Sequence, residues 1–375
     1  MRPTASPRAL ISSALFAIVA AMPALVHVQA HAQAQSRAWE AEWKRTLEAA
    51  NKEGKLTLNM HVETGQAEVV KAFEARYPGI KVNYTLENIA TFAPKLVTEQ
   101  RNGQYLWDVT MIPTSNAVTL MTPAGAFQDF LPQLILPEAT DASKWHGGLE
   151  MWAHNRTPVK KIFIHGGFTQ GGYSVNRDVI PKGELTSFEQ LTDPKWRGRI
   201  LIDEPSAPRL GSLSLLPMLQ AKGPEFVKEL LTAQKPVFTT NPRLMMEWYS
   251  TGRYPILIAE RSDVLREFKA RGVIKQSELN GPLYLAVWGL AVYTRAPNPN
   301  AAKVFVNWFL TKEGQEAYAK SRGDYGGVSR RNDVASLDPE NTPDWAKVNS
   351  YVSPNQERDA GQVRQVIDLY KATRQ

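Results

Sequence analysis

The sequence contains no cysteine among its 375 residues. Disulfides, thiolate metal sites and a cysteine nucleophile are therefore excluded together. A lipid-modified cysteine behind an export signal is excluded by the same absence, so we expect a protein that is free rather than tethered. Without disulfides, stability has to come from burial of an apolar core, and the chain is long enough for about two domains.

Motifs of common secreted hydrolases are also missing, since the chain has neither a GxSxG nor an HExxH segment. We therefore expect a protein that is not an enzyme, with no catalytic residue, no metal site of its own and no cofactor. A secreted enzyme is the remoter alternative, because catalytic groups can assemble from scattered positions.

Long runs of one charge are absent as well. The formal net charge is +7, but basic and acidic residues are interspersed. No basic stripe is interleaved with aromatic residues, so we expect no nucleic-acid partner. The mild positive balance instead favours anionic ligands.

One long apolar run is present, and it lies near the start of the chain. Residues 9–26 are apolar or small, follow Arg2 and Arg8, and precede the small-residue site Ala30-His31-Ala32. This pattern predicts a signal peptide over residues 1–32, cleaved to give a mature chain beginning near Gln33. A membrane anchor is the alternative, because about 18 apolar residues can just span a bilayer. We expect a periplasmic protein that is not itself embedded in the membrane.

The mature chain alternates predicted strands and helices in two series. The first series has strands at 55–60, 80–86 and 107–112, with helices at 39–52, 65–77, 92–101 and from 115. The second series has strands at 173–180, 199–203, 236–240 and 255–259, with helices at 187–191, 210–220, 224–233 and 243–251. A buried-strand pattern at 283–294 and a helix at 300–320 follow. This order predicts an α/β fold with largely parallel sheets and a ligand cleft between two lobes.

Three segments carry a resemblance to a known family. The first is KEGKLTL, FEARYPGIKVNY and WDVTMI in succession, the second is TSFEQLTDPKWRGRILIDEPSA, and the third is APNPNAAKVFVNWFLTKEGQEAYAK. Over roughly residues 53–330 the chain resembles the family-1 extracellular solute-binding proteins. These are periplasmic receptors of ABC importers, with ferric, thiamine, polyamine and phosphonate binders among the relatives.

The resemblance implies a two-lobe type II periplasmic-binding-protein fold, in which each lobe is a mixed sheet flanked by helices. Lobe one would comprise residues 39–151 and 283–375, and lobe two residues 165–280. Hinge crossings would lie near 163–172 and 281–287. The lobes would close around a small solute and then dock on an inner-membrane ABC permease, and we expect a monomer.

Candidate binding residues follow the predicted strands, because ligands of open α/β sheets sit at the carboxyl ends of strands. Helix capping alone is the alternative for each of these polar residues. The candidates are His61, Glu63, Thr64, Thr114, Ser115, Ser206, Arg209, Arg261, Ser262 and Trp288.

Arg261 bears on the kind of solute. In ferric binders of the tyrosine type, the strand similar to residues 255–259 is followed by adjacent tyrosines, whereas this chain has Glu260-Arg261-Ser262. A guanidinium repels a metal cation and pairs with carboxylate or phosphate, so we favour an anionic organic solute such as a carboxylate or phosphonate.

Two alternatives to this interpretation of Arg261 stay open. The protein could bind ferric ion or a metal chelate, with His61, Glu63, Tyr249 and Tyr254 as possible ligands. Arg261 could also form an ordinary ion pair with Glu260 or Asp263.

Overall fold

The computed structural model describes residues 38–61, 66–259, 262–322 and 327–374. The predicted signal peptide lies outside these residues. Within them, no helix combines the length and apolar character needed to cross a bilayer.

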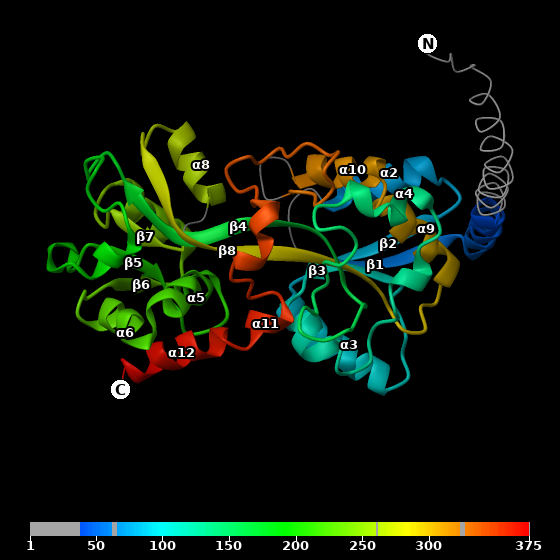
Figure 1. The fold of residues 1–375 in the computed structure, drawn as a ribbon, viewed down its shortest axis with the longest axis horizontal. Helices are drawn as coiled ribbons and strands as arrows, with labels where there is room; N and C mark the ends of the chain where they lie inside the picture. The colour runs from blue at the N-terminus through cyan, green and yellow to red at the C-terminus, as the bar shows by residue number, and fades with distance from the viewer. Residues whose placement is uncertain (1–37, 62–65, 260–261, 323–326, 375) are drawn as a thin grey trace, which may run out of the picture.

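The described strands form one eight-stranded sheet in the order β2-β1-β3-β8-β4-β7-β5-β6. Their bounds are β1 Lys55–His61, β2 Lys81–Glu87, β3 Val109–Pro113, β4 Phe163–Asn176, β5 Ile200–Asp203, β6 Val237–Thr239, β7 Ile256–Ile258 and β8 Ser277–Val292. The two long strands β4 and β8 run antiparallel through the middle of the molecule and join two half-sheets (Figure 1). The predicted α/β class is confirmed.

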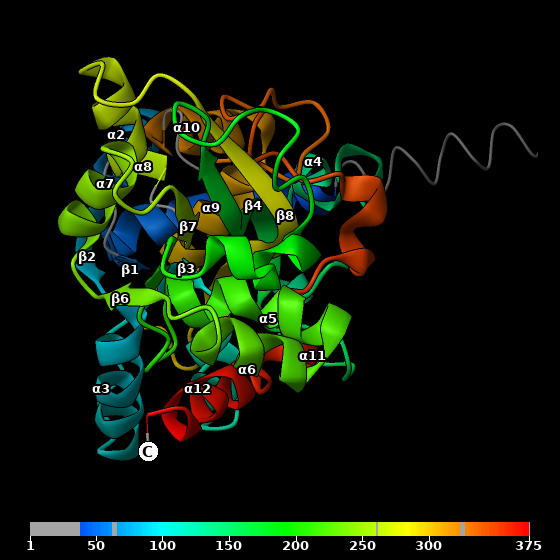
Figure 2. The same ribbon diagram turned by 90° about the vertical axis from the view of Figure 1, so that its left-hand side faces the viewer.

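Helices cover both faces of each half-sheet, as the two views show (Figures 1 and 2). A helix over residues 38–53 precedes β1. The main later helices are α2 Gln66–Arg76, α3 Ile89–Arg101, α5 Leu210–Lys222, α6 Pro224–Thr232, α7 Pro242–Ser250, α8 Ser262–Ala270, α9 Pro299–Phe309, α10 Lys312–Arg322 and α12 Val363–Ala372. The short ones are α4 Pro137–Thr140 and α11 Glu357–Ala360.

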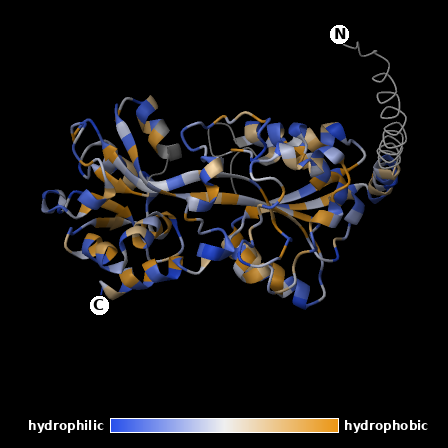
Figure 3. Cartoon of the chain, in the orientation of Figure 1, coloured by the Kyte–Doolittle hydropathy of each residue, from blue (hydrophilic) through white to orange (hydrophobic). Residues whose placement is uncertain are grey.

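The first half, β1 to β3, follows from an alternating pattern. Leu56, Leu58 and Met60 are fully buried at every second position of β1, because successive strand side chains point to opposite faces. They pack in one core cluster with residues of α2, α9 and α10. Figure 3 shows the apolar residues concentrated along the strands and the inner sides of the helices.

The second half, β5 to β7, is covered on both faces. Ile200 and Ile202 of β5 pack with α5 and α6, whereas Leu201 between them packs with α7 and α8. A strand buried on both faces has to be continuously apolar, which is why ILI occurs in both β5 and β7.

The C-terminal helix departs from the predicted division of the chain. We expected residues 283–375 to belong wholly to lobe one. Val363, Val366, Ile367 and Tyr370 of α12 instead pack in the core cluster of α5 and α6, and α12 runs along them in the second half (Figure 1). The apolar side of α12 covers the α5 and α6 residues of that core. The lobe and hinge boundaries as a whole stay predictions.

Two predicted elements also differ from the structure. Of the strand predicted at 173–180, residues 173–176 are the end of the longer strand β4 and residues 177–180 form a turn. The pairing of β4 with β8 shifts register between Gly171 and Tyr173. Gly172 there has φ +66°, and a Cβ atom would lie 2.1 Å from the Asn280 carbonyl oxygen. The single helix predicted at 300–320 is two helices, because the Thr311 hydroxyl accepts a hydrogen bond from the Gly314 N–H and starts α10.

Candidate binding site

The register of the central strands brings the carboxyl ends of the two half-sheets toward each other. Pro113, the last residue of β3, pairs with Trp288 of β8. Ile258, the last residue of β7, pairs with Tyr173 of β4. Between these two points no other named strand pairs with β4 or β8, and only isolated bridges join Gly166 to Ser329 and Tyr284 to Val352. The segments that follow β3 and β5 therefore face each other across this stretch, which is where a solute of an α/β sheet is expected.

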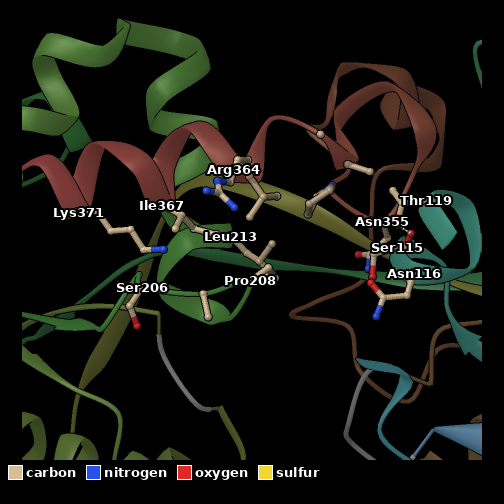
Figure 4. Close-up of a pocket in the computed structure, with 15 residues that line it drawn as sticks. Ser115, Asn116, Thr119, Ser206, Pro208, Leu213, Asn355, Arg364, Ile367 and Lys371 are labelled. Carbon is tan, nitrogen blue, oxygen red and sulfur yellow. Dashed lines mark hydrogen bonds between the residues drawn. The ribbon is translucent and has the colours of Figure 1, made fainter. Parts of the chain in front are cut away.

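A pocket of about 410 Å³ lies on this side of the molecule. Ser115 and Asn116 line it from the loop after β3, and Ser206 lines it from the loop after β5 (Figure 4). Asn355, Arg364 and Lys371 complete it from the C-terminal segment. Two of the predicted residues, Ser115 and Ser206, are thus brought together in one cavity.

Thr114 has a structural contact in the same loop. Its side chain is fully buried, and its hydroxyl donates a hydrogen bond to the Asn355 carbonyl oxygen. The bond joins the loop after β3 to the C-terminal segment, and its two residues are 241 positions apart in the sequence. Thr114 therefore shapes the pocket wall and does not line the cavity.

Arg209 pairs with a carboxylate of its own chain. Its Nε and Nη2 atoms lie 2.8 Å and 2.5 Å from the two carboxylate oxygens of Asp203. Asp203 also accepts a hydrogen bond of 2.9 Å from the Gly211 N–H in the first turn of α5. Arg209 is thus already paired within the chain, and the start of α5 already holds an anionic group. The solute contact of Arg209 stays a prediction.

His61 and Trp288 lie beside each other in the first half. His61 ends β1, and its ring centroid is 5.8 Å from that of Trp288. Trp288 is only 3% exposed. These two predicted residues are brought together, although neither is among the residues that line the pocket.

The remaining predictions fall on residues that cannot be placed. Glu63, Thr64 and Arg261 lie outside the described residues, and Ser262 begins α8 without a described side chain. The preceding Ala259 is buried and has φ +77°. A left-handed conformation is unusual for alanine and is most often kept where the surrounding structure requires it, here at the carboxyl end of β7.

The two tyrosines considered as metal ligands face into the second half. Tyr249 is fully buried, and its hydroxyl lies 2.6 Å from the Ser277 hydroxyl. Tyr254 packs edge-on against Trp248, with ring centroids 5.6 Å apart. Neither is among the residues that line the pocket, and their role as metal ligands stays a prediction. In the described part of the chain, no group of three or more His, Cys, Asp or Glu residues could hold a metal ion.

Sequence reasoning missed the C-terminal wall formed by Asn355, Arg364 and Lys371. The predicted lobe one includes this segment, away from lobe two. The apolar stripe of residues 363, 366, 367 and 370 was a visible signal for a helix that packs on a core. The sequence alone carries no signal for which core it packs on.

Two half-sheets that share two long central strands, with polar loops facing each other between them, define the two-lobe periplasmic-binding-protein class. The chain belongs to the family of bacterial extracellular solute-binding proteins, whose model matches residues 65–321. This family and this fold are those of solute-binding proteins rather than enzymes.

Solved structures show the same fold. The IdiA (FutA) protein of Trichodesmium, in complex with iron and citrate ligands, is 19% identical with a TM-score of 0.61, covering 85% of this chain and 99% of that one. Iron-bound HitA from Pseudomonas aeruginosa is 20% identical with a TM-score of 0.59 and the same coverage of each chain.

A curated relative is known from sequence. The iron uptake protein A1 of Synechocystis sp. is 25% identical over an alignment of 191 residues that covers 46% of this chain. The chain spans about half of that relative, 53% of its length.

Proposed function

We propose that this protein is the periplasmic receptor of an ABC importer and that its solute contains iron. The observation that carries this proposal is the likeness to proteins described as iron-bound or as iron uptake proteins. The sequence favoured an iron-free anionic solute, and the comparisons support its stated alternative, ferric ion or a metal chelate, better.

The arrangement of the loops suits capture between two lobes. A solute that contacts both half-sheets binds the closed form more tightly than the open form and shifts the population toward closure. Closure would occur by bending of the long strands β4 and β8, and the closed form would then dock on the permease.

Thermal melting of the mature protein tests the proposal. Ferric citrate is compared with citrate alone and with zinc citrate at equal concentrations. A ligand at 100 times its Kd stabilises by about 2.7 kcal/mol, so ferric citrate should raise the Tm by several degrees. Zinc citrate controls for a general effect of chelates and should give a smaller shift.

The alternatives have distinct signatures in the same experiment. Equal shifts with citrate and ferric citrate would instead support the iron-free anionic solute. A ferric salt that binds without citrate and gives a coloured tyrosinate complex would support binding of the bare ion.

A further inference from the structure

Two cations of α12 face the pocket between the half-sheets. Arg364 and Lys371 both line it, and Figure 4 shows them extending from α12 above the loop that carries Ser206. They are seven residues apart, which is about two helical turns, so they share one side of the helix roughly 10 Å apart. Both lie beyond residue 321, where the match to the family model ends.

The helix that carries these cations is firmly held. Val366 is fully buried, and Val363 and Tyr370 are each 5% exposed in the core formed with α5 and α6. The Tyr370 hydroxyl also donates a hydrogen bond of 3.1 Å to Glu204. Arg364 and Lys371 therefore project from a fixed wall, and less side-chain freedom is lost on binding than from a loose tail.

The opposite walls combine polar side chains with apolar ones such as Pro208 and Leu213. Ser115 and Asn116 face the cavity from the first half, and Ser206 from the second. None of the described residues that line the pocket is acidic. The nearest carboxylate on the helix, Asp368, lies 2.8 Å from the Arg364 Nε atom. The pocket thus combines two cations with hydroxyl and amide donors, the groups that bind carboxylate or phosphate.

We propose that this pocket is an anion subsite of the solute cleft, in which Arg364 and Lys371 bind carboxylate or phosphate groups that accompany the metal. Only the presence of iron in the solute rests on the proposed function. Arg364 would fork onto one anionic group and Lys371 would act as a point charge on another. Because both half-sheets line the pocket, an anion there contacts both and favours closure.

Calorimetric titration with ferric citrate and ferric pyrophosphate tests the subsite and separates carboxylate from phosphate. The double variant Arg364→Gln/Lys371→Gln should lose about tenfold in affinity for the chelate that binds, since each exposed cation contributes a few-fold. The matched control Lys228→Gln/Lys320→Gln changes the net charge equally on exposed residues outside the pocket. It should bind like the wild type.

A variant of opposite sign sharpens the test. Asp368→Asn removes the carboxylate that competes for Arg364, so affinity should rise two- to threefold. Lys371→Arg keeps the charge and should retain most of the binding. Melting curves without ligand should be unchanged in all these variants, because the substituted side chains are exposed.

The outcomes distinguish this inference from the proposed function. Equal affinity of wild type and the Arg364/Lys371 double variant for the iron chelates would overturn the subsite and leave the iron proposal standing. No binding of any iron form by the wild type would contradict the iron proposal. In that case the binding of citrate and pyrophosphate without iron would test the subsite. Weaker binding by the double variant than by the wild type would support the subsite. Equal binding by both proteins, or no binding by the wild type, would overturn it.

Discussion

The two halves of the molecule are built on the same plan but are completed from different parts of the chain. The core of the first half, around β1 and β3, is closed by α9 and α10, which follow β8 directly. The core of the second half is closed by α12, at the end of the chain. The second half therefore depends on a segment that reaches it by way of the first, through Thr114 and Asn355.

Each half also contains a buried aspartate, and the two carboxylates have different kinds of partner. Asp108 at the edge of β3 accepts hydrogen bonds from Thr57 and Asn298, all from neutral N–H groups. Burial raises the pKa of its carboxyl above the usual value. Asp203 in the second half is held by the guanidinium of Arg209. A neutral network thus stabilises the first half, and an ion pair beside the pocket stabilises the second.

Core truncations should give the largest effects. Ile367→Ala in α12 and Ile80→Ala in the first half remove the same atoms from buried sites, and each should cost about 2–5 kcal/mol. Hydrogen exchange should locate the loss of protection in the second half for Ile367→Ala and in the first half for Ile80→Ala. A cost near zero for Ile367→Ala would mean that α12 is not part of the second core.

Removing a partner of each aspartate should give the next largest effect. Arg209→Ala leaves the Asp203 carboxylate buried without its cation, at about 2–3 kcal/mol once the partial exposure of Arg209 is allowed for. Asn298→Ala removes one neutral donor from Asp108 and should cost about 1–2 kcal/mol. Denaturant unfolding measures both. Weaker solute binding by Arg209→Ala with unchanged stability would instead support the predicted solute contact.

Acid should weaken the first half before the second. The four described histidines all belong to the first half or to the start of β4, and burial lowers the pKa of His165 to about 3. The unfolded chain then binds a proton at His165 below its ordinary pKa of 6.5, whereas the folded chain does so only near 3. Stability should therefore fall as the pH drops from 6.5 toward 3, by up to about 1.4 kcal/mol per pH unit.

His165→Leu isolates this contribution. The two ring nitrogens of His165 have no hydrogen-bond partner among the described residues, so the substitution should cost little at pH 7. Calorimetry between pH 4 and 7 should show a shallower loss of stability for the variant than for the wild type. Parallel pH profiles would show that His165 does not carry the effect.

Much of the fold was predictable because it depends on local patterns. The alternation in β1 and the apolar runs of β5 and β7 predicted strands that the structure contains. The break between α9 and α10 was missed because buried apolar residues occur on both sides of Thr311, at Phe309 in α9 and at Tyr318 in α10. The full length of β4 was missed because its glycine-rich middle has no strand pattern, and only its pairing with β8 makes it a strand.

The site was predictable only where it depends on strand order. Ser115 and Ser206 follow strand ends, and the rule that ligands sit there placed both at the pocket. The same rule nominated Arg209, which pairs with Asp203, and Thr114, which holds the C-terminal segment. Spacing along the chain does not show whether a cation meets a solute or a nearby carboxylate, because both contacts suit the same residue.

The sequence by itself determined the α/β class, the order of most elements and the family, because each rests on periodicity or on short contiguous motifs. Only the tertiary structure decided that α12 closes the second half and brings Arg364 and Lys371 to the pocket. An amphipathic helix carries the requirement to bury one side, but not the identity of the surface that buries it. That choice depends on contacts between residues more than 100 positions apart in the chain.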